Sequence, residues 1–263
     1  MFNKDIYFFK TKQLEEKILD IVKNNKEFIL HIEHDNKFYW LKRSSKSDSS
    51  FIHKLIYKTT KAKGLMPVIP SEKESVLYHE VTKLQRLKEK NINVPEVVAC
   101  QKDFLVLEDK GVNLRKYIRH TVLDTSETEE LIKKTVNVLA QIHNVGEYHA
   151  GSQIKNYTLK DDLISAIDFE DKFSNDISLH DIQFRDFFLF LVSLSDLKKE
   201  LDYKEIIDIY KKLTKNETID KELKILANKF NFLANIIETK FIYNKVSRDV
   251  INNYKLIRTL QEL

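Results

Sequence analysis

Cysteine, glycine and proline are all scarce in this 263-residue sequence. It contains one cysteine, Cys100, together with four glycines and three prolines. A single cysteine excludes an internal disulfide framework and fits a reducing compartment. Because so few glycines and prolines leave few forced turns, we expect long helices to dominate the chain.

Long apolar runs are missing as well. The longest uninterrupted one, 187–192, is far shorter than the roughly 20 residues of a membrane-spanning helix, and the first residues lack the apolar core of a secretion signal. We therefore expect a cytoplasmic protein without a transmembrane segment. The hydrophobic content of 42% is typical of a folded chain, and the length suits one medium domain or two tightly joined lobes. A net charge of +4 permits an anionic partner without requiring one; nucleic acid is not expected.

The stretch 148–170, YHAGSQIKNYTLKDDLISAIDFE, is the one around which the chain is organised. Two short apolar runs flank the polar turn 160–162, which is typical of a tight hairpin. Since antiparallel partners lie at equal distances from the turn, Asn156 falls nearly opposite Asp168. An amide oxygen facing a carboxylate suits Mg²⁺. The alternative is a surface hairpin whose ends these two side chains merely cap.

A second hairpin is predicted after an opening helix within 5–25. Strand-like apolar runs flank the turn residues 34–37. Alternation along the second strand places Lys42 on the same face as Phe38 and Trp40. Lys42 therefore points along an apolar face.

Glu80 lies inside the apolar stripe of a helix predicted over 71–90, which starts at the capping box Ser71-x-x-Glu74. A carboxylate on a packing face is costly unless it finds a cation. Lys42 is the predicted partner. The alternative is that Lys42 and Glu80 are unrelated, and that each side chain extends to water from the edge of its strand or helix.

The remaining elements are mostly helical. The segment 43–50 is predicted to be a Ser-rich linker and 51–63 a helix. Residues 97–107 are predicted to form a strand pair that leads to a break at 107–111.

A second capping box, Ser126-x-x-Glu129, predicts a helix that stops at Gly146. His143 on its buried face is interpreted as a hydrogen-bonded core residue. Asp186 precedes the apolar helix 187–194. Its carboxylate either accepts hydrogen bonds from backbone N–H groups of the loop before Asn156 or supplies favourable charge at the helix start. Two or three amphipathic helices are predicted over 201–263.

The pattern H-x-G-x-x-x-x-N, followed by a short hairpin and I-D-F-E, resembles the catalytic and metal-binding loops of the protein-kinase-like superfamily. It is most similar to bacterial lipopolysaccharide core (heptose and Kdo) kinases and related small atypical kinases. The resemblance implies an α+β, bilobal fold. Residues 1–109 would form an N-lobe with a small β-sheet and one key helix, and residues 110–263 a mainly helical C-lobe that carries the catalytic-loop hairpin.

The resemblance also implies a site that uses ATP and Mg²⁺. The catalytic set would be Lys42, Glu80, Asn156 and Asp168, of which Lys42 and Glu80 form the pair that positions the α- and β-phosphates. Asn156 and Asp168 would bind the metal. His149 and Asp186 would support the loop. Glu108 and Asp109 would contribute to nucleotide binding, because they lie at the hinge where a kinase contacts the adenine ring.

Two features depart from the family pattern. Gly151 stands where active kinases usually carry the aspartate that accepts the substrate hydroxyl proton, and the sequence offers no clear general base. The candidate replacements, among which nothing in the sequence chooses, are His149, Gln153, Glu170 and Asp171. The hairpin also lacks a glycine-rich loop, so side chains such as those of His34 and Asn36 would have to cradle the phosphates.

Two functions remain open. The first is an ATP- and Mg²⁺-dependent phosphotransferase that acts on lipopolysaccharide core or on another sugar or small molecule. The second is a pseudokinase, which binds nucleotide or acts as a regulatory, partner-binding module. The expected partners are a nucleotide and either a phosphorylated saccharide or a protein. The basic segments 42–46 and 58–63 would also suit peripheral contact with the inner face of the membrane.

Overall fold

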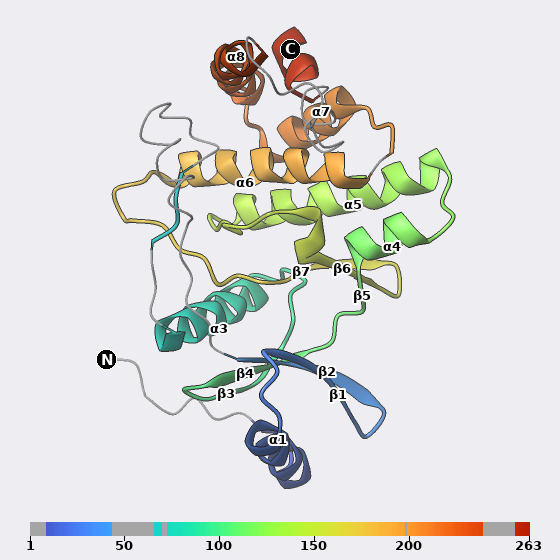
Figure 1. The fold of residues 1–263 in the computed structure, drawn as a ribbon, viewed down its shortest axis with the longest axis vertical. Helices are drawn as coiled ribbons and strands as arrows, with labels where there is room; N and C mark the ends of the chain where they lie inside the picture. The colour runs from blue at the N-terminus through green and yellow to red at the C-terminus, as the bar shows by residue number, and fades with distance from the viewer. Residues whose placement is uncertain (1–8, 44–65, 70–72, 198, 239–255) are drawn as a thin grey trace.

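The computed structural model describes residues 9–43, 66–69, 73–197, 199–238 and 256–263. In chain order the elements are α1 (Lys12–Asn24), β1 (Ile29–His34), β2 (Lys37–Arg43), α3 (Lys73–Glu89), β3 (Val97–Cys100), β4 (Phe104–Glu108), β5 (Val112–Asn113), α4 (Leu114–His120), α5 (Thr125–Asn144), β6 (Tyr157–Lys160), β7 (Leu163–Ala166), α6 (Leu179–Leu194), α7 (Tyr203–Thr214) and α8 (Ile219–Glu238). A small sheet with α1 and α3 occupies one end of the molecule, and the other end is mainly helical (Figure 1). This is the expected α+β, two-part architecture.

The sheet at the small end has the strand order β1-β2-β4-β3, and all of its neighbours are antiparallel. The predicted first hairpin is confirmed: His34 pairs with Lys37, and both residues between them have positive φ. Leu41 is fully buried on the face that packs against Leu14 and Ile18 of α1. Lys42, next in sequence, therefore points to the opposite face.

The helix α3 lies between the sheet and the helical end (Figure 1). Its buried residues Val81 and Leu84 belong to the same core cluster as Leu105 and Leu107 of β4. Cys100 of β3 is buried in this cluster as well, and burial raises the pKa of its thiol to about 12. The inner face of the sheet is thus continuous with the main core.

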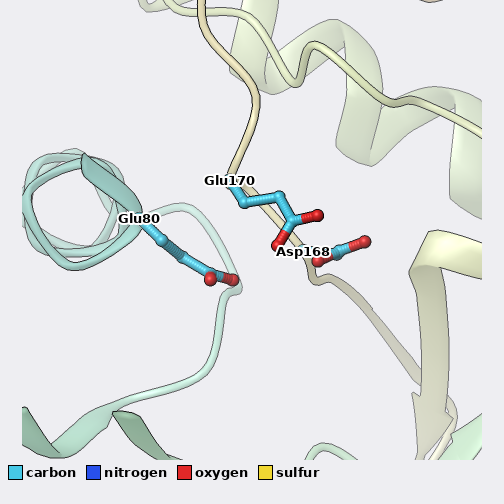
Figure 2. Close-up of side chains that lie close together, drawn as sticks. All are labelled: Glu80, Asp168 and Glu170. Carbon is cyan, nitrogen blue, oxygen red and sulfur yellow. The ribbon is translucent and has the colours of Figure 1, made fainter. Parts of the chain in front are cut away.

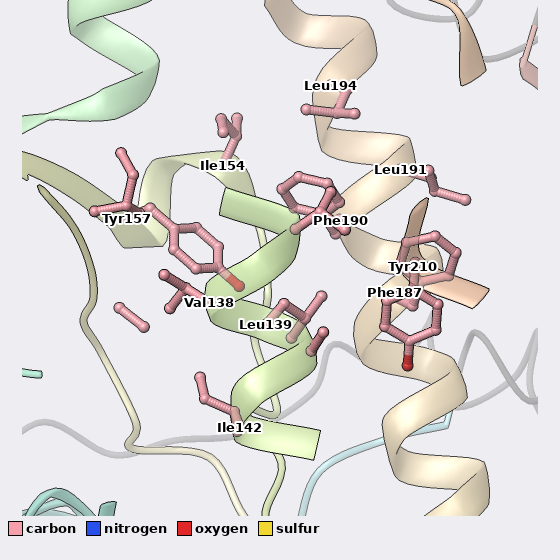
Figure 3. Packing of buried hydrophobic residues seen from close by; sticks show 14 of the residues in the cluster. Val138, Leu139, Ile142, Ile154, Tyr157, Phe187, Phe190, Leu191, Leu194 and Tyr210 are labelled. Atoms are coloured by element: carbon pink, nitrogen blue, oxygen red, sulfur yellow. The ribbon is translucent and has the colours of Figure 1, made fainter. Parts of the chain in front are cut away.

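The main core lies between the long helices α5, α6 and α7 (Figure 3). Leu139 and Ile142 of α5 lie among Phe187 and Phe190 of α6, and Tyr210 of α7 stacks on Phe187 with ring centroids 3.7 Å apart. No helix in the part of the chain that the structure describes is long and apolar enough to cross a membrane.

The predicted hairpin within 148–170 is confirmed, with a shift of one residue in its register. Tyr157 pairs with Ala166, and the Ile167 N–H donates to the Asn156 carbonyl over 2.9 Å. Asn156 is therefore opposite Ile167, and Asp168 is the next residue along the chain.

Two helix starts differ from the prediction. The capping box of α5 is formed by Asp124 and Glu127, not by Ser126 and Glu129, because the Asp124 side chain accepts from the Glu127 N–H and the Glu127 carboxylate accepts from the Asp124 N–H. The helix α6 begins at Leu179 after the Ser178 cap, so Asp186 lies inside the helix.

Several predictions concern residues outside the described ranges. These are most of the linker 43–50, the helix 51–63, the start of the capping box at Ser71, and residues 239–255 of the tail. The rest of the tail confirms the predicted helices, with α7, α8 and helical residues 256–262.

Candidate active site

The amine of Lys42 is the centre of a cluster of three carboxylates. Its Nζ lies 3.0 Å from Glu80 Oε2, 2.6 Å from Asp168 Oδ1 and 2.8 Å from Glu170 Oε2. Lys42 and Glu80 come from neighbouring elements of the small lobe, β2 and α3, whereas Asp168 and Glu170 follow β7. The predicted ion pair is confirmed, and Lys42 also contacts the predicted metal loop after β7.

Burial and these contacts together shift the pKa values of Lys42, Glu80 and Asp168. Burial opposes the charged form of Lys42, but the surrounding carboxylates outweigh it and raise the pKa of Lys42 well above its usual value. Burial raises the pKa of Glu80, and the charge of Lys42 acts against this rise. Burial also acts to raise the pKa of Asp168, but the charge and hydrogen bond of Lys42 outweigh it and lower this pKa.

Figure 2 shows the three carboxylates that surround this amine. Glu80 reaches from α3 toward Asp168 and Glu170 on the loop after β7, and oxygens of the three groups lie within 4.8 Å of one another. Glu80 also accepts from the Phe169 N–H over 3.3 Å. One buried carboxylate thus contacts both Lys42 and the backbone of the loop after β7, where Asp168 itself has a φ of 70°.

The other predicted metal ligand, Asn156, directly precedes β6, the strand that pairs with β7. The Asn156 side chain is almost buried, and its Nδ2 donates to the Gly151 carbonyl over 2.8 Å. This leaves the Asn156 amide oxygen as the atom that can coordinate a cation. Together with the Asp168 carboxylate it gives a set of oxygen donors, which fits Mg²⁺.

The loop before Asn156 is held by Asp186 from inside α6. Its Oδ2 accepts from the N–H groups of His149 over 2.5 Å and Ala150 over 3.1 Å, which confirms that its donors are backbone groups. His143 lies 3.4 Å from the same carboxylate and 2.7 Å from the Tyr210 hydroxyl, as expected for a core histidine. Ala150 has a φ of 79°, so this loop is locally strained and needs these contacts.

His149 is fully buried beneath Phe169, with ring centroids 4.4 Å apart. Its Nδ1 accepts from the Gly151 N–H over 3.3 Å, and burial lowers the pKa of the ring. A neutral, enclosed ring of this kind suits loop support better than proton transfer.

Gly151 does not have a positive φ, and a Cβ built on it would meet only Asn156 Nδ2, at 3.4 Å. Of the candidate replacements for the missing aspartate, Glu170 is paired with Lys42 and the side chain of His149 is buried. The side chains of Gln153 and Asp171 are half-buried.

The predicted hinge residues make structural contacts. Asp109 accepts from His31 Nε2 over 2.6 Å and from the Gly111 N–H over 2.7 Å. Glu108 accepts from the Glu96 N–H over 3.1 Å. Their role in nucleotide binding stays a prediction. His34, one of the two side chains expected to cradle phosphates, is only 13% exposed at its side chain and lies 3.3 Å from Asp35.

Two contacts were not predicted. Glu170, which the sequence offered only as a replacement base in the D-F-E element, is a third carboxylate on Lys42. Arg185 is buried, and it donates from Nε to the Met66 carbonyl over 3.0 Å and from Nη1 to the Ala150 carbonyl. An arginine next to Asp186 in an otherwise apolar helix was the available signal.

No protein-family model matches the sequence. It is similar to an uncharacterized protein of Haemophilus influenzae, with 24% identity over 174 residues that cover 66% of this chain and 65% of that protein, just under two thirds of its length. Among solved structures, it is similar to WaaP in complex with acyl carrier protein, with a TM-score of 0.56 and 14% identity over 89% of this chain and 98% of the matched chain.

A streptomycin–ATP–APH(2″)-IIa ternary complex is also matched, over 98% of this chain and 97% of that one, but its TM-score of 0.35 and identity of 11% are too low to carry an argument. The likeness to WaaP concerns the fold alone. It shows that this chain shares its fold with WaaP, and the Lys42–Glu80 ion pair is the contact expected of a protein-kinase-like fold.

Proposed function

We propose that this protein is an ATP- and Mg²⁺-dependent phosphotransferase. The observation that carries the proposal is the Lys42 amine, which lies within hydrogen-bonding distance of both Glu80 and Asp168. In phosphoryl transfer a protein contributes mostly position and charge, because the transferred group passes through a loose transition state. A lysine held between the two lobes supplies both.

Each residue then has a separate task. Lys42 would bind the α- and β-phosphates once they displace Asp168 and Glu170 from its amine, and Glu80 would keep the amine in place. Asn156 and Asp168 would hold Mg²⁺, which neutralises phosphate charge when bound. Asp186 would fix the backbone of the loop that presents Asn156.

The proposed acceptor is a hydroxyl of lipopolysaccharide core or of another phosphorylated saccharide. The loop motifs and the fold shared with WaaP support this choice. We propose that the reaction takes place in the cytoplasm, and at the inner face of the membrane when the acceptor is lipid-linked. WaaP was solved with acyl carrier protein, so a protein partner is a further proposal for this chain.

A pseudokinase is the second candidate, and two observations favour it. Gly151 offers no side chain to accept the hydroxyl proton, although general-base catalysis typically contributes about 10²- to 10⁴-fold in rate. Glu170 also occupies the Lys42 amine that phosphates would need. Nucleotide binding without transfer would be the expected behaviour.

Thermal unfolding with and without Mg-ATP tests nucleotide binding. We expect Mg-ATP to raise the melting temperature of the wild type, Lys42→Ala to weaken this effect, and Asp168→Ala to abolish it. Lys88→Ala is the matched control, because Lys88 is an exposed lysine of α3. An unchanged melting temperature for the wild type would contradict the phosphotransferase.

A transfer assay separates the two candidates. Purified protein is incubated with γ-labelled ATP, Mg²⁺ and isolated lipopolysaccharide core. Labelled core that disappears in Asn156→Ala supports the enzyme, whereas ATP binding without any labelled product supports the pseudokinase.

A further inference from the structure

Residues 66–69, which lie between β2 and α3 in the sequence, pack against the large lobe; we call them the strap. Met66 and Val68 of the strap are buried. The hydrophobic cluster that they join contains Ala150, Phe173 and Ile182. Figure 1 shows the strap beside α6, although β2 and α3 both belong to the small lobe. The chain therefore crosses to the large lobe and returns, which connects the lobes apart from the link between β4 and β5.

Arg185 of α6 fastens the strap to the loop before Asn156. Its guanidinium donates from Nε to the Met66 carbonyl over 3.0 Å and from Nη1 to the Ala150 carbonyl, and it lies 5.0 Å from the centre of the Phe173 ring. Arg185 is buried, and an arginine keeps its charge in proteins. Because hydrogen bonds from a charged donor are stronger than neutral ones, this side chain joins the two backbone segments firmly.

The small lobe also contacts the loop that follows β7. The Ile69 N–H of the strap donates to the Lys172 carbonyl over 3.0 Å. On α3, His79 Nε2 donates to the Asp171 carbonyl over 3.2 Å. Two successive carbonyls of this loop therefore accept from residues on either side of the start of α3.

These contacts bear on the position of Glu80, which directly follows His79 in α3. The Glu80 carboxylate accepts from the Lys42 amine over 3.0 Å and from the Phe169 N–H over 3.3 Å. Both hydrogen bonds form only when α3 lies close to the loop after β7. The phosphoryl transfer proposed above gives Arg185 and the strap no task of their own.

We propose that Arg185 is a positioning residue, and that Arg185 and the strap form a clamp between the lobes. The clamp holds α3 against the loop after β7, so that Glu80 reaches both Lys42 and the Phe169 N–H. Release of the strap would loosen α3 and these two contacts, while the helices of the large lobe stay folded. The effect of the clamp on nucleotide binding rests on the proposed function, whereas the clamp itself does not.

Amide hydrogen exchange of the full chain without nucleotide tests the clamp, and the amides to follow are those of Ile69 and Phe169. In Arg185→Met we expect both to exchange about tenfold faster, because hydrogen bonds from a charged donor are lost. Met66→Ala, which removes a buried side chain of the strap and keeps Arg185, should also speed exchange at Phe169. Arg119→Met is the matched control, since Arg119 is an exposed arginine of α4, and it should behave as the wild type.

A residue that only stabilises α6 would give a different pattern. Arg185→Met would then speed exchange within α6 and leave Ile69 and Phe169 unchanged, which would overturn the proposal. Unchanged exchange at Phe169 in Met66→Ala would overturn it as well, and this variant decides alone if Arg185→Met does not fold. The double variant should exchange at Phe169 no faster than Arg185→Met, because both changes release one contact. Additive effects would assign them to separate contacts and contradict the clamp.

The affinity for Mg-ATP is measured for the same variants. It should fall several-fold in Arg185→Met and Met66→Ala and stay unchanged in Arg119→Met. If the wild type binds no Mg-ATP, the proposed function fails, while the exchange rates still decide whether the clamp exists.

Discussion

Glu80 is a fully buried carboxylate whose cation, Lys42, comes from β2. Lys42→Met would leave this carboxylate buried beside Asp168 and Glu170 without its counter-charge. Loss of one partner of a buried pair costs about 3–5 kcal/mol, and we expect a loss of that order at pH 7. The double variant Lys42→Met/Glu80→Leu should recover most of it. Urea unfolding of both variants measures the difference.

The same experiment has a predicted pH dependence. Burial already raises the pKa of Glu80 above its usual value of 4.5, and removal of Lys42 raises it further. A raised pKa means that the folded state favours the protonated acid, so the stability gained from protonation is present at low pH and is lost as pH rises. The destabilisation by Lys42→Met should therefore be smaller at pH 5 than at pH 8. An equal loss at both values would show that Glu80 is not the group left unpaired.

Gly151 allows a test of the missing base. Its φ is not positive, and a Cβ would approach only Asn156 Nδ2, so Gly151→Asp should fold with little strain. If the rest of the site is competent, transfer to an acceptor should rise by about 10²-fold or more, since a positioned base typically contributes that much. Gly151→Asn is the isosteric control and should give no rise.

At the site, the sequence predicted the residues with a local signature and missed those defined by distant packing. Lys42 and Glu80 were found because each is a charge on an apolar face, and Asp168 because it ends a hairpin. Arg185 carries no sign of its partner: Met66, to whose carbonyl it donates, lies 119 positions earlier in the chain. No periodicity within α6 encodes that contact.

Among the elements, the start of α5 is a case in which two patterns compete. Asp124-x-x-Glu127 and Ser126-x-x-Glu129 both read as capping boxes, and the structure uses the first. Asp124→Ala should therefore cost about 1 kcal/mol, while Ser126→Ala should be close to neutral. Thermal or urea unfolding of the two variants checks the assignment, and the reverse order of effects would refute it.

Strands and hairpins were predicted well because alternation and turn residues are local. The turn 34–37 and the turn 160–162 both lie where expected, with positive φ at Asp35, Asn36, Asp161 and Asp162. The start of α6 was placed too late, because its first turns are mixed in polarity and the strongly apolar part begins only at Phe187. Burial of Ile182 and Phe184 draws these turns into the helix.

In the molecule as a whole, the outer face of the sheet and α1 form a hydrophobic cluster separate from the main core. Ile18 is fully buried in that cluster. Ile18→Ala should cost about 2–5 kcal/mol and should speed hydrogen exchange in β1 and β2 far more than in α5 and α6. Leu139→Ala, in the main core, is the matched control and should speed exchange in α5 and α6. Uniform acceleration by Ile18→Ala would mean that the two cores unfold together.

The enclosed thiol of Cys100 makes the chain convenient for spectroscopy. A thiol reacts with maleimides through its thiolate, which burial suppresses here. Cysteines introduced at Phe28 in the small lobe and Val122 in the large lobe, both exposed, would accept dyes while the native thiol stays unlabelled. Energy transfer between such dyes would report the distance between the two lobes, with and without Mg-ATP, without removal of the natural cysteine.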